Sequence, residues 1–95
     1  MLSRGASSGR VLQINLSGQD LTGEVPAELS KLTALDFLDL GDNQLTGAVP
    51  SELGHLTALT FMSLRGNLLS GEIPAGIGLL TTLEHLNLGD KLIIS

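Results

Sequence analysis

Apolar and polar residues alternate in four short segments, which recur at a fixed spacing of 24 residues along the chain. The segments are QINL at 13–16, FLDL at 37–40, FMSL at 61–64 and HLNL at 85–88. Such alternation is typical of a short strand with one buried face. Because coils of equal length place equivalent residues side by side, we expect the four strands to pair in parallel.

The segments between these strands repeat as well. The phrase NQLTGAVP at 43–50 matches QDLTGEVP at 19–26 and NLLSGEIP at 67–74. Glycine permits tight curvature there and proline bars regular strand pairing, so we expect an extended stretch. The following PAELSKL, PSELGHL and PAGIGLL carry apolar residues at every third position, which favours a short 3-10 or irregular turn. A repeat of this length predicts a solenoid of about four stacked units.

Residues 32–56, LTALDFLDLGDNQLTGAVPSELGHL, resemble the plant-specific leucine-rich repeat, L-x-x-L-x-x-L-x-L-x-x-N-x-L-[ST]-G-x-I-P-x-x-L-G. The resemblance runs from about Val11 to Ile93. It implies an α/β right-handed solenoid, with a short parallel sheet on the concave side and 3-10 or irregular turns on the convex side. Residues 1–10 lack the repeat, so we expect a flexible arm or partial cap there and the solenoid over 11–95.

One column of the repeat reads Gln19, Asn43, Asn67, Lys91. The resemblance implies that Asn43 and Asn67 form a structural ladder, hydrogen-bonding backbone groups of neighbouring coils. An amide donates and accepts at once, whereas an ammonium group cannot accept. We therefore expect Gln19 and Lys91 to stand at the ends of the ladder.

Stacking the strands predicts a partner-binding surface on the concave sheet. Its aromatic column contains Phe37 and Phe61, followed by His85, and rigid aromatic side chains are efficient interface anchors. Asp39, Ser63 and Arg65 would add polar contacts to a protein or peptide. For the aromatic column, the alternative is that the rings only stack and shield the sheet. For the acidic rim, the alternative to a site for a basic partner is a solvated face. That rim consists of Asp36, Asp39, Asp42, Glu84 and Asp90.

Composition narrows the possible functions. A net charge of −5 disfavours nucleic acid as a partner, because phosphate binding needs basic patches. No apolar run approaches the roughly 18 residues of a membrane span, Met1–Arg10 does not read as a secretory signal, and there is no cysteine. His55 and His85 fall in different coils without a nucleophile or carboxylate partner. We expect no enzyme, no cofactor and no metal site.

The ends of the solenoid suggest an alternative, a self-assembling structural unit. The last coil carries Leu83, Leu86, Leu88 and Ile93, with few residues left to cover them. We therefore expect self-association through the coil ends, chiefly the C-terminal face and as a symmetric dimer, since terminal repeats need polar outer faces.

Two further expectations concern modification and setting. Asn15-Leu16-Ser17 is an N-glycosylation motif, although the repeat consensus supplies similar residues. The resemblance suggests an extracellular or cell-surface protein, and inhibition of a secreted hydrolase is a less favoured function.

Overall fold

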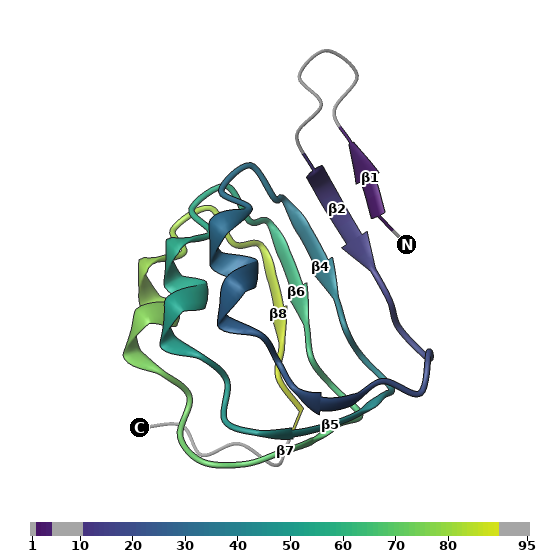
Figure 1. Ribbon diagram of the computed structural model, residues 1–95. Helices are drawn as coiled ribbons and strands as arrows, with labels where there is room; N and C mark the ends of the chain where they lie inside the picture. The colour runs from purple at the N-terminus through teal and green to yellow at the C-terminus, as the bar shows by residue number, and fades with distance from the viewer. Residues whose placement is uncertain (1, 5–10, 90–95) are drawn as a thin grey trace.

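The computed structural model describes residues 2–4 and 11–89, and its strands stack into the expected solenoid (Figure 1). A five-stranded sheet runs in the order β1-β2-β4-β6-β8. Its strands are β1 (Leu2–Arg4), β2 (Val11–Asn15), β4 (Phe37–Asp39), β6 (Phe61–Ser63) and β8 (His85–Asn87). From β2 to β8 the pairing is parallel and in the 24-residue register, which confirms the parallel sheet predicted from the alternating segments.

Two further sides complete each coil. The L-[TS]-G segments form a second parallel sheet, β3-β5-β7, from β3 (Thr22–Glu24), β5 (Gln44–Gly47) and β7 (Leu68–Leu69). Three 3-10 helices, η1 (Ala27–Lys31), η2 (Ser51–His55) and η3 (Ala75–Leu79), stack on the side away from the five-stranded sheet (Figure 1). Each helix begins directly after a proline in extended conformation, since proline fixes φ and suits the residue before a turn.

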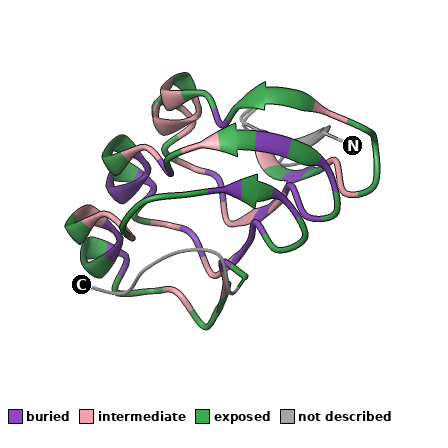
Figure 2. Ribbon diagram, turned by 90° about the horizontal axis from the view of Figure 1, so that it is seen from below, coloured by how far each residue is buried: buried purple, intermediate pink, exposed green. Residues whose placement is uncertain are grey.

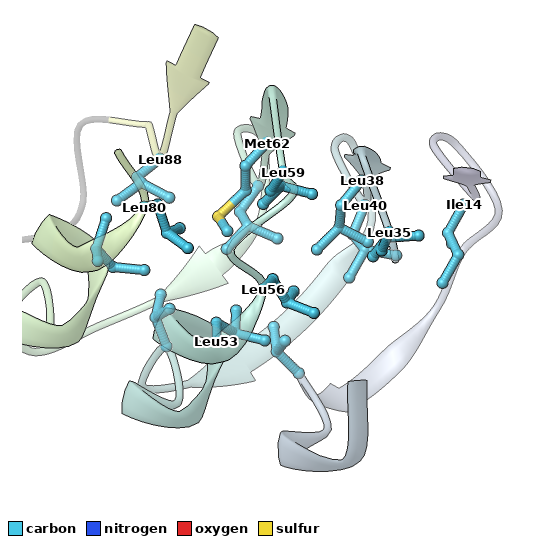
Figure 3. Close-up of a cluster of buried hydrophobic side chains, with 14 of the residues drawn as sticks. Ile14, Leu35, Leu38, Leu40, Leu53, Leu56, Leu59, Met62, Leu80 and Leu88 are labelled. Atoms are coloured by element: carbon cyan, nitrogen blue, oxygen red, sulfur yellow. The ribbon is translucent and has the colours of Figure 1, made fainter. Parts of the chain in front are cut away.

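The core lies inside the coils, where leucine columns from successive repeats meet (Figure 3). The side chains with less than 2% exposure all come from the two central coils and are Leu35, Leu38, Leu53, Leu56, Leu59, Met62 and Leu64. The helices approach closely, because Gly54 presents no Cβ to the backbone of Gly76. Figure 2 shows the resulting division, with buried residues toward the interior and exposed residues on the outer surface.

The N-terminal arm contributes a strand that the repeat pattern does not predict. β1 pairs with β2 in antiparallel orientation, with Leu2 opposite Ile14 and Arg4 opposite Val11. β2 therefore pairs on both sides, with β1 and with β4. The remainder of the arm, residues 1 and 5–10, lies outside the described residues.

The two ends of the solenoid differ in how well the core is covered. In the first coil Leu16, Leu21, Leu29 and Leu32 are only partly buried, and they line an apolar cavity of about 550 Å³. In the last coil Leu86 is 42% exposed and Leu83 is partly buried. The expectation that Leu88 is uncovered is wrong, because Leu88 is only 8% exposed and belongs to the buried core cluster. Ile93 lies outside the described residues.

Within the described part of the chain, no helix is both long and apolar enough to cross a membrane.

Candidate binding surface

An aromatic stack crosses the outer face of the five-stranded sheet. The ring centroids of Phe37 and Phe61 are 4.4 Å apart with planes 6° from parallel, and Phe61 and His85 are 4.6 Å apart at 5°. The cause is the register, which pairs Phe37 with Phe61 and Phe61 with His85 on strands about 4.8 Å apart. The stacking that the sequence left as an alternative is therefore present. Both Phe rings are half-buried, and His85 is exposed.

A polar row lies beside this stack, formed in register by Asn15, Asp39, Ser63 and Asn87. Three of these side chains bend toward the end of their own strand. Oδ1 of Asn15, Asp39 and Asn87 accepts a hydrogen bond from the backbone N–H two residues on, at 3.3, 2.9 and 3.0 Å respectively. For Asp39 this leaves one carboxylate oxygen without an intramolecular bond among the described residues, and that oxygen can face a partner.

Ser63 does not fulfil the role predicted for it. Its residue is only 4% exposed, so its hydroxyl cannot be a readily accessible contact for a partner. In the sheet register Ser63 lies between Asp39 and Asn87, whose side chains are longer. The alternation along the strand correctly placed Ser63 on the outer face. Alternation does not, however, indicate what fraction of a side chain is exposed on that face.

Charged residues lie on the strands that carry the stack or close to the ends of these strands. Arg65 follows β6 and is exposed, as are Asp42 and Glu84, whereas Asp36 and Asp39 are partly buried. The backbone N–H of Asp42 donates to the carbonyl oxygen of Arg65 at 2.8 Å, which fixes the two strand exits side by side. Asp90, the remaining member of the predicted rim, lies outside the described residues.

The asparagine column performs a different, structural task. Asn43 and Asn67 are 7% and 8% exposed. Asn43 Oδ1 accepts from the N–H groups of Gln19 and Leu21, and its Nδ2 donates to the carbonyls of Leu16, Leu40 and Gly41. Asn67 Oδ1 accepts from Leu45 N–H, and its Nδ2 donates to the carbonyls of Leu40, Leu64 and Arg65. Each amide thus joins its own turn to the preceding coil.

Gln19 behaves differently from these two residues. It is exposed, and its Nε2 makes only a local bond of 3.3 Å to the carbonyl of Ser17 among the described residues. Lys91, at the other end of the column, lies outside the described residues.

The two histidines lie on different sides of the coil. His55 is in η2 and His85 is in β8. Among residues 2–4 and 11–89, no three side chains of the metal-ligating types gather closely enough to hold a metal ion.

These features define a class of protein: a parallel-strand solenoid with an exposed, shallow sheet face. The Leucine Rich Repeat family matches residues 34–56 and 58–80. The protein is a leucine-rich repeat protein, and its repeats are of the plant-specific type. No curated protein gives a significant match to the chain.

Solved structures of plant receptors share the fold. The PEPR1–AtPEP1 structure matches with 32% identity and a TM-score of 0.86, over 93% of this chain and 12% of that one. The BIR3–SERK2 complex from Arabidopsis thaliana matches with 34% identity and a TM-score of 0.86, over 94% and 48%. The plant peptide hormone receptor RGFR1 in complex with RGF2 matches with 26% identity and a TM-score of 0.74, over 88% and 16%. The chain thus spans less than half the length of each of these relatives.

Proposed function

We propose that this protein is a non-catalytic recognition module that binds a protein or peptide on the outer face of the five-stranded sheet. The observation that carries the proposal is the aromatic stack of Phe37, Phe61 and His85 on that face. The similar structures include a peptide hormone receptor with its ligand and a complex of two proteins, which supports a partner of this kind.

The stack suits such a partner for physical reasons. The rings are held in place by three in-register strands, so little conformational entropy is lost when a ligand packs on them. Asp39, in the polar row beside the stack, and Arg65, exposed just after β6, add polar groups that can fix orientation. Apolar anchors with a polar surround are the usual anatomy of a binding patch.

Replacing both aromatic anchors should abolish most of the binding. We expect Phe37→Ala/Phe61→Ala to raise the dissociation constant for a partner at least about tenfold. Two central anchors commonly contribute about 1.4 kcal/mol or more to the free energy of binding. The immobilised chain would be used to retain proteins and peptides from extracellular extracts, and the affinity of each retained species would then be measured by calorimetry.

A double variant on the opposite side provides the control. His55→Ala/Leu79→Ala removes two exposed side chains from η2 and η3 and should leave the affinity unchanged. Thermal melts of both variants would establish that they remain folded. If the partner is lost with the helix-side variant and kept by the sheet-side variant, the proposed surface is wrong.

A second candidate, self-association through the coil ends, is favoured by the apolar cavity in the first coil. That cavity of about 550 Å³ and the exposed Leu86 leave apolar surface at both ends of the solenoid. Within this chain each coil packs one face against the opposite face of the next coil, so apolar coil faces of this kind do stack, whereas a two-fold dimer would join like faces. A symmetric dimer would cover the like ends without open growth.

Light scattering at micromolar concentration should therefore find more than one chain per particle. Leu86→Lys should reduce that mass, because it places a charge on the end of the last coil. Leu68→Lys is the matched control, since Leu68 is 62% exposed in β7 on the side of the coil. A folded monomer that persists at high concentration would remove this candidate.

A further inference from the structure

The motif Asn15-Leu16-Ser17 stands where β2 ends. The asparagine ladder uses only the backbone carbonyl of Leu16, and the side chains of Asn15 and Ser17 belong neither to the ladder nor to the aromatic stack. The motif is the only Asn-x-Ser/Thr sequence in the chain. Asn15 is exposed, and Ser17 is partly buried. An acceptor side chain must be reachable from solvent, and this one is.

In the side-chain amide of Asn15, the oxygen accepts hydrogen bonds and the nitrogen makes none to the described residues. Its Oδ1 accepts from the backbone N–H of Ser17 at 3.3 Å and from the hydroxyl of Ser17 at 3.1 Å. Its Nδ2 donates to no other described residue. The amide nitrogen is therefore left without competition from an intramolecular acceptor in the described part of the chain.

The equivalent turns of the other coils show what is particular to the first. Asp39 and Asn87 accept the same backbone hydrogen bond, from Gly41 and Gly89. That turn is thus a property of the repeat and not of the motif. What only the first coil has is an amide followed two residues later by a hydroxyl, since the residues aligned with Ser17 are Gly41, Arg65 and Gly89.

We propose that Asn15 is the acceptor of a single N-linked oligosaccharide when the chain passes through a secretory pathway. The donor class is an oligosaccharide attached to a polyprenyl pyrophosphate, used by the transferase of that pathway. A bond forms between Nδ2 of Asn15 and the anomeric carbon of the sugar, and the bond from that carbon to the pyrophosphate oxygen breaks. Polyprenyl pyrophosphate leaves with the electron pair, and one proton of Nδ2 goes to a base of the transferase.

The fold tolerates this modification, because Asn15 is exposed and the hydrogen bonds that its side chain makes to described residues are the local ones to Ser17. The glycan would stand on the outer face of the sheet, one strand away from Phe37 and Asp39. Modification of Asn15 is independent of the proposed function. If both hold, the glycan stands next to β4, and β6 and β8 are the strands of the face that lie farthest from it.

The experiment is secretion of the full chain from insect or plant cells behind a cleavable signal, followed by intact-mass spectrometry. We expect a mass increase of one oligosaccharide per chain, which peptide N-glycosidase removes while converting Asn15 to the acid. Asn15→Gln and Ser17→Ala should each abolish the increase, and Ser17→Thr should retain it. Asn87→Gln, the matched asparagine without a hydroxyl two residues on, should leave the increase intact.

A copy of the chain with an added Asn-Ala-Thr tail after Ser95 controls for the host. Glycosylation at both Asn15 and the tail supports the proposal. Glycosylation of the tail with an unmodified Asn15 overturns it, as does a mass increase that survives in Asn15→Gln without the tail.

Discussion

Leu64→Ala is expected to lower the free energy of unfolding by about 2–5 kcal/mol. Leu64 is 1% exposed and stands in a central coil, with Leu40 and Leu88 in the same column on either side. Truncation removes buried methyl groups and leaves a cavity that the stacked coils cannot readily close, because the backbone hydrogen bonds of both sheets hold their spacing. A loss of this size is a large share of the stability of a small domain.

Chemical denaturation monitored by circular dichroism would measure the change, with Leu68→Ala as the matched control. Leu68 is the same residue type four positions away, yet it is 62% exposed, so its truncation should have little effect. Equal losses for the two variants would show that the apolar columns do not form the core in this register.

Asn43→Ala is expected to be the other severely destabilising substitution. The substitution removes the hydrogen bonds that Asn43 accepts from the backbone N–H groups of Gln19 and Leu21. It also removes those that Asn43 donates to the carbonyls of Leu16, Leu40 and Gly41. Leaving one buried backbone group unpaired costs about 1–3 kcal/mol, and alanine leaves more than one. Since Asn43 bridges two coils, we expect loss of the first coil before the rest of the solenoid.

Gln19→Ala is the control for Asn43→Ala, because Gln19 stands in the same column at its end. Gln19 is exposed and its side chain makes one local bond, so its removal should cost well under 1 kcal/mol. Thermal melts, with hydrogen exchange at Leu21 and Leu45 to locate the opening, would measure both variants. Comparable losses would contradict the division of the column into an internal ladder and its end.

Much of the architecture could be predicted from the repeat. The alternation in FLDL and FMSL correctly indicated strands, and the equal spacing correctly indicated that Phe37 and Phe61 are neighbours. The short helical turns were predicted by apolar residues at every third position after proline. These predictions succeed because each repeat is a local unit whose pattern is read several times.

Features that break the repeat could not be predicted in the same way. β1 comes from residues 2–4, which have no counterpart in the other coils, so no column indicates that they pair with β2. The apolar cavity in the first coil depends on how far its partly buried leucines are covered, and residue spacing does not indicate that coverage.

For this protein, the sequence by itself determined the coil length, the strand register and the identity of the core columns, because these depend only on residue spacing. The tertiary structure decided how accessible each side chain is. Ser63 lies on the predicted face yet is buried, and Leu88 lies in the last coil yet is covered. Accessibility depends on the size and position of neighbours from other coils, and these are brought together only when the coils stack.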